Sequence, residues 1–445
     1  MRIYISSTKY DRKFVDLILH ELMSDGHEIT HESLNIKAGD NWFKKINEGI
    51  KEFDAIIIIL SRDSINSRRA LKEIESIVLN EITSQSTRII PITTDRSLPP
   101  SYLMNYRVID FSRDINFGLE KLRVSLSSNI AEPRDKEKKE RIQKDHSSRN
   151  ESFLKHLKDS LKSGDLTLVC GAGVSIGAKI PSWNDLLLDL LETMMIRISN
   201  DQSLSLKNIN TRDYQEKLGS SSLVTGKYLK SNLGKEFLNE LREALYKNNP
   251  KTCDIIDAIV DVSRPQRDGK PLDSIITFNF DALIEENLKS NNIRFKAIDN
   301  EGVRNSAHEL PVYHVHGYLP RTGKISTDSD VVFSEDSYHT QFIEPFSWSN
   351  LIQLNKLSQN TCLFIGLSLT DPNLRRLLDV ANRKDPTNNL NHYIIKRTPN
   401  LSDNSNKIDD LMIFLEEQDA NELGLNVIWV DEFDEIAPLI RKLIN

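Results

Sequence analysis

The chain has 445 residues and a formal net charge of −7, which is enough sequence for two or three folded domains. A mildly acidic protein is a poor general binder of nucleic acid, because duplex binding needs a surplus of Lys and Arg facing phosphates. No apolar run approaches the roughly 20 residues that a membrane-spanning helix needs. We therefore expect neither a membrane protein nor direct binding of nucleic acid.

Cysteine usage and the first residues bear on the compartment. The three cysteines, Cys170, Cys253 and Cys362, are far apart and form no C-x-x-C pair, which excludes a disulfide framework and a four-thiolate zinc site. The segment Met1–Ile5 already reads as a strand, so no signal peptide is expected before the fold. We expect a soluble cytoplasmic protein without bound zinc.

Residues 1 to about 123 alternate between strands and helices. Helices are expected at Asp11–Asp25 and at about Ser67–Thr83, where apolar residues recur at helical spacing. Strands are expected at Arg2–Ile5, Ala55–Leu60, Arg88–Ile92 and Arg107–Phe111. Strand–helix alternation with short loops predicts a parallel sheet that is covered on both faces.

A highly charged stretch follows, at residues 124–150. It includes Glu132-Pro-Arg-Asp-Lys-Glu-Lys-Lys-Glu-Arg141, which contains almost nothing apolar. Such a composition is typical of a solvated helix or a disordered linker. We place the domain boundary here and expect a charged spacer rather than an interaction tail.

Residues 151–445 are expected to form a second α/β domain. A long helical insertion, around Trp183–Val262, is expected between its first two strands. The strands are predicted at Leu166–Cys170, Ser274–Phe278, Val312–Val315, Cys362–Ile365, Tyr393–Ile395 and Asn426–Val430. Both halves of the chain are thus predicted to be α/β.

A glycine turn follows the first strand of this second domain. The segment Gly171-Ala-Gly-Val-Ser-Ile-Gly177 comes directly after the apolar run. Glycines permit positive φ and let a backbone approach a pyrophosphate closely. The third glycine is one position later than in a strict G-x-G-x-x-G, so an ordinary strand-to-helix turn is an equal alternative.

Polar residues also end the next predicted strand. In Thr277-Phe-Asn-Phe-Asp281, strand alternation puts Thr277, Asn279 and Asp281 on one face. Such a triplet at the end of a buried strand needs hydrogen-bond partners or a ligand. The alternative is that these side chains cap loops.

The third motif is Tyr313-His-Val-His-Gly317, in which His314 and His316 share a face. An H-x-H pair could bind a metal, but no third ligand is evident nearby, so no metal site is expected. A purely structural histidine is the other alternative. Since open α/β sheets bind ligands at the carboxyl ends of their strands, we expect all three motifs to meet around one dinucleotide.

In this order, the three motifs resemble the sirtuin family. Two further segments, Phe364-Ile-Gly-Leu-Ser-Leu-Thr-Asp-Pro-Asn-Leu374 and Pro181-Ser-Trp-Asn-Asp-Leu186, resemble its branch in bacterial defence proteins. The resemblance covers about residues 155–440 and implies a Rossmann-like NAD site with Asn279 and His316 as the catalytic pair. The NAD-binding residues that it implies are Gly171, Ala172, Gly173, Ser175, Thr277, Asp281, Gly366 and Ser368.

One departure from the family bears on the reaction. Sirtuin deacylases carry a four-cysteine zinc module that helps to shape the acyl-lysine cleft, and three cysteines cannot build it. The resemblance therefore implies NAD⁺ glycohydrolysis with water as acceptor, giving nicotinamide and ADP-ribose, and no cofactor beyond NAD⁺ as the substrate. Protein deacylation is the less favoured alternative.

Four motifs in the first 123 residues resemble a TIR domain, which implies a flavodoxin-like sheet. They are Ile3-Tyr-Ile-Ser-Ser-Thr8, Asn35-Ile-Lys-Ala-Gly-Asp-Asn-Trp42, Asp54-Ala-Ile-Ile-Ile-Ile-Leu-Ser61 and Ser67-Arg-Arg-Ala-Leu-Lys-Glu-Ile74. The resemblance implies either assembly through the loop Ser33–Asp40 or cleavage of NAD⁺ by Glu73. Periodicity alone does not select Glu73, which with Glu75 flanks the apolar stripe of its helix, and exposed helical glutamates are usually only solvated.

Two further positions of the TIR-like region enter this comparison. Arg69 stands where many TIR domains have a Trp, and we interpret Trp42 as a helix anchor.

The combination of the two domains implies an effector of bacterial antiphage immunity that depletes NAD⁺. We expect a homo-oligomer and a phage-derived trigger that the sequence does not identify. Two alternatives stay open: a TIR half that only assembles and senses, or a sirtuin-like half that only binds an NAD-derived signal made by the TIR half.

Overall fold

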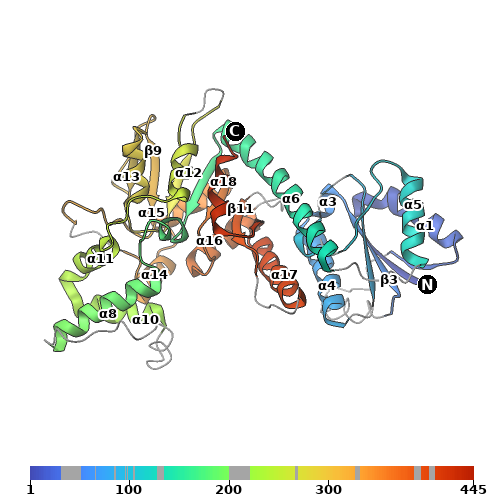
Figure 1. Cartoon of the computed structure of the whole chain (residues 1–445), viewed down its shortest axis with the longest axis horizontal. Helices are drawn as coiled ribbons and strands as arrows, with labels where there is room; N and C mark the ends of the chain where they lie inside the picture. The colour runs from blue at the N-terminus through green and yellow to red at the C-terminus, as the bar shows by residue number, and fades with distance from the viewer. Residues whose placement is uncertain are drawn as a thin grey trace. The chain divides into compact units, whose positions relative to one another are not determined.

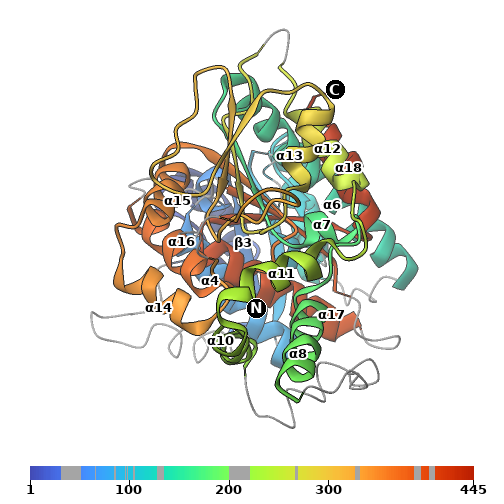
Figure 2. The same ribbon diagram turned by 90° about the vertical axis from the view of Figure 1, so that its left-hand side faces the viewer.

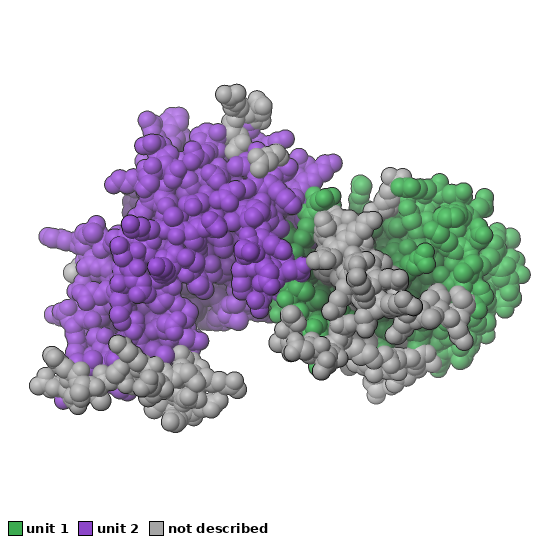
Figure 3. Space-filling view, viewed as in Figure 1, with its two compact units in different colours: residues 1–152, 385–390, 398–429 green, residues 153–384, 391–397, 430–445 purple. Residues whose placement is uncertain are grey.

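The computed structural model forms two compact units, which Figure 3 colours separately. Unit 1 is Met1–Ser152, Asp385–Leu390 and Thr398–Trp429, and unit 2 is Phe153–Lys384, Asn391–Arg397 and Val430–Asn445. The structure describes residues 1–31, 52–65, 67–84, 87–95, 97, 99–103, 106–127, 135–199, 221–265, 269–325, 331–384, 392–399 and 406–444.

Unit 1 contains a five-stranded parallel sheet with the order β2-β1-β3-β4-β5. The strands are β1 (Arg2–Ser6), β2 (Glu28–Thr30), β3 (Ala55–Leu60), β4 (Arg88–Thr93) and β5 (Ile109–Asp110). This is the flavodoxin-like strand order, which confirms the predicted fold class of this half.

Apolar residues on alternate positions of these strands face helices on opposite sides of the sheet. Ile57 packs with α1 (Arg12–Ser24) and α5 (Ile115–Ser127), whereas its neighbour Ile56 packs with α4 (Arg68–Ser84) (Figure 1). The six residues of β3 are all buried, as expected for a central strand of a parallel sheet. Short helical turns complete the unit: η1 (Lys9–Asp11), α3 (Arg62–Ile65) and η2 (Ser101–Leu103).

A helix from late in the chain also belongs to unit 1. Phe414 of α17 (Asn406–Glu422) is fully buried in the same core cluster as α4, with its ring 5.2 Å from that of Tyr102. Sequence analysis places residues 398–429 in the second domain, whereas the compact unit groups them with the first. The core of unit 1 therefore includes a helix from late in the chain.

The same helix changes the surroundings of Glu75, which the sequence places at the edge of an apolar stripe. Glu75 is buried, and the Gln418 side chain of α17 donates a hydrogen bond of 3.2 Å to its Oε2. Burial, with a further contribution from the charge of Glu422, raises the pKa of Glu75 to about 8. No local pattern around Glu75 contains this information, because the covering helix lies more than three hundred residues away in sequence.

The charged stretch between the predicted domains is partly helical. The helix α6 (Asp135–Ser163) begins inside the predicted linker of residues 124–150 and continues into the predicted second domain. Residues 135–150 thus take the helical one of the two forms that their composition allowed. Residues 128–134 lie outside the described part of the chain.

The second sheet has seven strands in the order β12-β11-β10-β6-β7-β9-β8. Its strands are β6 (Leu166–Cys170), β7 (Ser274–Thr277), β8 (Phe295–Ile298), β9 (Leu310–His314), β10 (Thr361–Ile365), β11 (His392–Arg397) and β12 (Leu425–Val430). From β8 to β11 every neighbouring pair is parallel. The six predicted strands are therefore present, and β8 is an addition to them.

Helices cover both faces of this sheet in unit 2. Figure 2 shows α15 (Trp348–Gln359) and α16 (Pro372–Lys384) on one side, and α12 (Asp254–Val262), α13 (Leu283–Ser290) and α18 (Ile436–Arg441) on the other. The remaining helices are α7 (Gly173–Ile176), α8 (Trp183–Ser199), α10 (Ser222–Leu233), η3 (Gly234–Glu236), α11 (Phe237–Tyr246), α14 (Glu335–Ile343) and η4 (Phe433–Glu435). Within the described residues, the predicted helical insertion consists of α8, α10, η3, α11 and α12. None of the helices in the described ranges has the length and apolarity that crossing a membrane requires.

Two loops at the carboxyl edge of this sheet are in direct backbone contact. The amide of Gly171 donates to the carbonyl of Ile365, and that of Gly173 donates to the carbonyl of Gly366, over 2.9 and 3.0 Å. A Cβ at Gly173 would lie 2.7 Å from the Cα of Gly366, and one at Gly366 would lie 2.6 Å from the amide nitrogen of Val174. Glycines at these positions are required by space, because neither loop leaves room for a side chain.

Replacing Gly173 by Ala should therefore destabilise unit 2. Alanine at the first position of α7 would favour a helix by up to ~1 kcal/mol, but forcing a methyl group against the Gly366 backbone costs about 1–3 kcal/mol. Urea unfolding of the full chain should show a lower midpoint. Gly302→Ala is the matched control, since its φ is not positive and a Cβ there would meet only the end of the Asn300 side chain, at 3.1 Å. Equal midpoints for wild type and Gly173→Ala would disprove the close-contact argument.

Truncation of Phe414 should loosen α4, although the two are far apart in sequence. Loss of a fully buried Phe costs about 3–5 kcal/mol. Hydrogen exchange measured by mass spectrometry on peptides of α4 should be faster in Phe414→Ala than in Leu415→Ala, whose side chain is on the exposed side of α17. Unchanged exchange in α4 would show that α17 is not part of this core.

Candidate functional site

The sheet order brings the three predicted motifs next to one another. The strands β10, β6, β7 and β9 are consecutive neighbours, and each is followed by residues that sequence analysis singles out. The order of the strands reverses at β6. The strands β7 and β9 lie on one side of it, whereas β10 lies on the other. Open α/β sheets bind ligands outside the carboxyl ends of strands at such a switch point.

Asn279 is held against the glycine turn. The strand β7 ends at Thr277, whose hydroxyl accepts a hydrogen bond of 3.1 Å from the backbone amide of Asn279. The side-chain nitrogen of Asn279 donates to the hydroxyl of Ser175, also over 3.1 Å, and Ser175 is completely buried. Among the described residues no donor reaches the side-chain oxygen of Asn279. This oxygen is therefore available to accept a hydrogen bond from a ligand.

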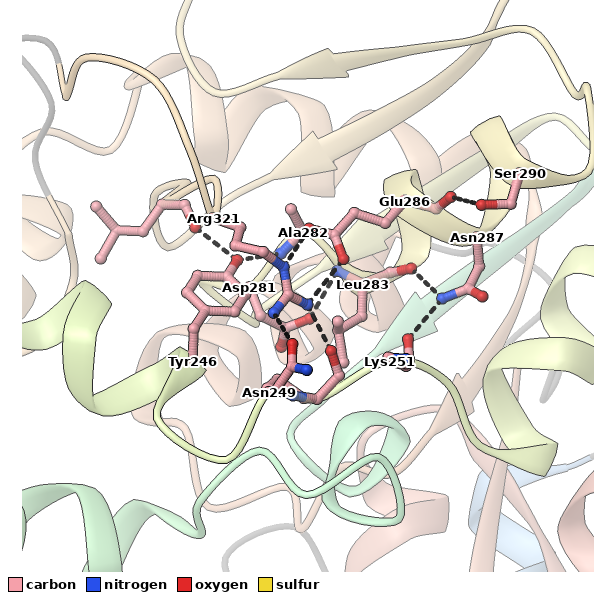
Figure 4. Close-up of polar contacts among 12 residues, drawn as sticks. Tyr246, Asn249, Lys251, Asp281, Ala282, Leu283, Glu286, Asn287, Ser290 and Arg321 are labelled. Carbon is pink, nitrogen blue, oxygen red and sulfur yellow. Dashed lines mark hydrogen bonds and ion pairs between the residues drawn. The ribbon is translucent and has the colours of Figure 1, made fainter.

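Asp281 is fixed from two directions. Its Oδ1 accepts a hydrogen bond of 3.3 Å from Ser175. The same oxygen accepts one of 3.0 Å from the amide of Leu283, at the start of α13 (Figure 4). Burial raises the pKa of Asp281 to about 6, against the Leu283 hydrogen bond and with a contribution from the charge of Glu285. Asp281 thus caps a loop, which was the alternative considered for this triplet, and also contacts the glycine turn.

The start of α13 is anchored by Tyr246 of the helical insertion. The Tyr246 hydroxyl accepts a hydrogen bond from the amide of Ala282 and donates one to the carbonyl of Leu319, both 2.8 Å long (Figure 4). Arg321 also binds the Glu286 carboxylate of α13 through two hydrogen bonds of 2.9 Å. These contacts hold the residues that directly follow the loop from Asn279 to Asp281.

The buried ring of His314 supports Asn279 from behind. Its Nε2 lies 2.6 Å from Glu285 Oε1, and its Nδ1 lies 3.2 Å from the backbone oxygen of Asn279. Burial lowers the pKa of His314, but the charge of Glu285 and the hydrogen bonds to Glu285 and Asn279 together raise it above its ordinary value. A protonated ring can donate from both nitrogens, as these two acceptors require. His314 is accordingly a positioning group with no free nitrogen.

His316 has different surroundings. Its side chain is 8% exposed, and its ring packs edge-on against those of Phe278 and Tyr338, with centroids 4.7 and 5.9 Å away. Its Nε2 lies 3.4 Å from Asp371 Oδ2 but has no hydrogen bond of good geometry within the described residues. Burial lowers the pKa of His316, while the charge of Asp371 opposes the decrease. The ring is neutral near pH 7, which is the form that can accept a proton.

The two histidines have different neighbours. His314 contacts Glu285 and Asn279, whereas His316 lies beside Asp371 and Tyr338. In the part of the chain that the structure describes, no group of three or more His, Cys, Asp or Glu side chains has an arrangement that could hold a metal ion.

The other residues implied for NAD⁺ binding lie at the same sheet edge. Gly171 and Gly173 form the turn that contacts Gly366, and Ala172 between them is exposed. Ser368 is also exposed, and its hydroxyl lies 2.8 Å from that of Thr370. Backbone amides and hydroxyls at exposed positions next to a glycine turn can donate hydrogen bonds to phosphate oxygens.

Glu73, the third predicted catalytic residue, belongs to unit 1. Its Oε1 accepts hydrogen bonds from the Tyr4 hydroxyl and the Ser6 hydroxyl of β1, over 3.0 and 2.9 Å, and its side chain is half-buried. It is not the freely solvated glutamate that helical periodicity alone favours. The loop Ser33–Asp40, Trp42 and the side chain of Arg69 lie outside the described residues.

Sequence analysis missed three residues of this site. Glu285, Tyr338 and Asp371 contact the predicted histidines, and none is assigned a role from the sequence. Asp371 lies within the quoted segment Phe364–Leu374, so its position in a motif was a usable signal. Glu285 and Tyr338 carry no such signal, because neither lies in a segment that resembles a family motif.

Two family models match separate parts of the chain. Residues 273–420 match the model of the SIR2-like domain, and residues 3–123 match that of the TIR domain. The chain is 23% identical over 312 residues to NAD(+) hydrolase ThsA of Enterococcus faecium, which covers 65% of this chain and 57% of that protein. It is 24% identical over 307 residues to NAD(+) hydrolase ThsA of Acinetobacter baumannii, which covers 64% of this chain and 54% of that protein.

The chain thus spans little more than half the length of these two curated relatives. The two domain matches do not overlap, and they agree with the two resemblances found in the motifs. The chain carries a TIR domain at its amino end and, after it, a SIR2-like domain.

Proposed function

We propose that this protein is an NAD⁺ glycohydrolase whose reaction takes place at the carboxyl edge of the seven-stranded sheet. The observation that supports it best is the contact between Asn279 and Ser175 of the glycine turn, in a site where His316 is buried and neutral. The curated relatives are named NAD(+) hydrolases, which supports the same reaction.

The side chains suit cleavage of the bond between nicotinamide and ribose. Nicotinamide leaves as a neutral molecule, and the ribose passes through an oxocarbenium-like state that water attacks, giving ADP-ribose and a proton. The free oxygen of Asn279 can accept a hydrogen bond from a ribose hydroxyl or from the water. His316 can accept the proton that is released. Orientation and stabilisation of developing charge supply most of the rate.

In this proposal the protein acts in bacterial antiphage defence, in the cytoplasm, by depleting host NAD⁺. An NAD⁺ hydrolase that is always active would be toxic to its own cell. We therefore propose that the protein rests in an inactive state. A phage-derived trigger activates it by causing homo-oligomer assembly. The TIR domain supplies assembly and sensing in this scheme.

A second candidate places an additional NAD⁺-cleaving centre at Glu73. The observation that favours it is the pair of hydroxyls, from Tyr4 and Ser6, that fix one carboxylate oxygen and leave the other for a ligand. In that case the SIR2-like domain could bind an NAD-derived product instead of cleaving NAD⁺. Substitutions in each domain of the full chain separate the two candidates.

Asn279→Ala and His316→Ala should each lower NAD⁺ turnover by about a hundredfold or more, because each removes a group that acts on the reacting ribose. Nicotinamide release by the purified full-length protein is the measurement. The matched controls are Asn305→Ala and His339→Ala, whose side chains are exposed. Melting temperatures verify that all four variants are folded.

Glu73→Ala is measured beside them. Unchanged turnover in Glu73→Ala, with loss in His316→Ala, is the expected result. Wild-type turnover in His316→Ala combined with loss in Glu73→Ala would transfer the activity to the TIR domain and refute the leading proposal.

The pH dependence follows from the protonation of His316. Because burial lowers its pKa below the ordinary value of 6.5, the ring stays neutral at mildly acidic pH. We expect kcat/KM to hold down to about pH 6.5 and to fall only below it, as His316 gains a proton. Asp281 titrates at about 6, so the profile is repeated with Asp281→Asn, in which the remaining acid limb belongs to His316. An acid limb centred above pH 6.5 would contradict the assignment.

A further inference from the structure

Asp371 is the carboxylate that lies closest to the proposed base. It stands between β10 and α16, in unit 2, and its side chain is 12% exposed. Its Oδ2 lies 3.4 Å from His316 Nε2, a buried nitrogen that has no hydrogen bond within the described residues. A buried ring nitrogen without a partner is costly, so this pair needs an explanation.

The carboxylate of Asp371 is held in place from two sides. Its Oδ1 accepts a hydrogen bond of 2.7 Å from the amide of Leu374 and so caps the first turn of α16. Its Oδ2 accepts one, also of 2.7 Å, from the Tyr338 hydroxyl of α14, a helix that lies beside α16. Burial and the charge of Asp371 raise the pKa of Tyr338 far above its ordinary value, so the phenol remains a donor. The carboxylate therefore cannot turn away from His316 without breaking both bonds.

The two nitrogens of His316 are not equivalent. The Nε2 atom faces Asp371. Nε2 is one of the buried polar atoms that lack a hydrogen-bond partner, and Nδ1 is not among them. A carboxylate can only accept, so it favours the neutral tautomer in which Nε2 carries the proton. In that tautomer Nδ1 has the lone pair.

We propose that Asp371 is a positioning residue for His316: its carboxylate accepts the Nε2–H of the neutral ring, which leaves Nδ1 as the nitrogen that takes up the proton. A ring rotation that shortens the 3.4 Å separation completes the bond. When Nδ1 gains its proton, the imidazolium is stabilised by the adjacent negative charge. The catalytic part of this inference rests on the proposed NAD⁺ cleavage, whereas the coupling of Asp371 to His316 does not.

Asp371→Asn isolates the charge from the structural role. Asparagine is as good a helix cap as aspartate, so its oxygen can keep the bond from the Leu374 amide. Its side-chain nitrogen can donate to the Tyr338 hydroxyl in place of the present bond, so the fold should be kept. The control is Asp379→Asn on α16, a half-buried carboxylate that pairs with Arg383. Tyr338→Phe removes the hydroxyl but keeps the charge of Asp371.

The direct readout is the titration of the His316 ring by NMR in the full-length protein labelled at histidine, with the signal identified by its loss in His316→Gln. Among the described residues, the groups found beside the ring that can change its titration are Asp371, which directly precedes α16, and Tyr338 on α14. We expect Asp371→Asn to lower the pKa of His316 further, and Asp379→Asn to leave it unchanged. Tyr338→Phe should retain most of the wild-type value, because the carboxylate remains.

Activity is the second readout. We expect Asp371→Asn to lower kcat by about tenfold or more with little change in KM, and to move the acid limb to lower pH. An unchanged His316 titration and kcat in a folded Asp371→Asn variant would overturn the inference and leave Asp371 as a helix cap only. If wild type itself releases no nicotinamide while the titration shifts as expected, the proposed function fails and the Asp371–His316 coupling stands.

Discussion

The candidate site depends on one close contact between two backbones. The turn from Gly171 to Gly173 donates two hydrogen bonds to the carbonyls of Ile365 and Gly366, and neither side leaves space for a Cβ. This contact fixes how the turn after β6 and the loop after β10 lie at the edge of the sheet. The first loop supplies Ser175, which holds Asn279, and the second leads to Asp371, which lies beside His316. A backbone shift of a few tenths of an ångström at the glycines would therefore displace both Ser175 and Asp371, and with them the groups that hold Asn279 and His316.

Behind the reactive side chains, burial and neighbouring carboxylates change the pKa values of two histidines that are separated by one residue. Glu285 raises the pKa of His314, which supports the Asn279 backbone, and the pair shares a hydrogen bond of 2.6 Å in a buried position. His316 lies 3.4 Å from Asp371 without a hydrogen bond to it, and burial makes this ring the weaker base of the two. The same H-x-H pattern thus yields one structural and one chemically available imidazole, and the difference comes from the partners on α13, α14 and α16.

Sequence patterns predicted much of this architecture, for identifiable reasons. The strands β3, β6 and β10 are short apolar runs next to turn residues, and the motifs after β6, β7 and β9 follow the strand ends closely. Two partners of the histidines, Glu285 and Tyr338, were not predictable, because they reach the site only through the packing of their helices. The same reason applies to Glu75, which α17 buries from a distant part of the sequence. The short edge strands β2 and β8 were missed, since only one of the seven residues in them is buried and neither has a clear apolar pattern.

The most direct test of the account is an experimental structure of the full-length His316→Ala protein with NAD⁺ bound. The account predicts the pyrophosphate against the turn at Gly171–Ser175 and the loop at Gly366, with the nicotinamide riboside beside Asn279. NAD⁺ bound instead at Glu73 in the TIR domain, with the edge of the seven-stranded sheet empty, would contradict it.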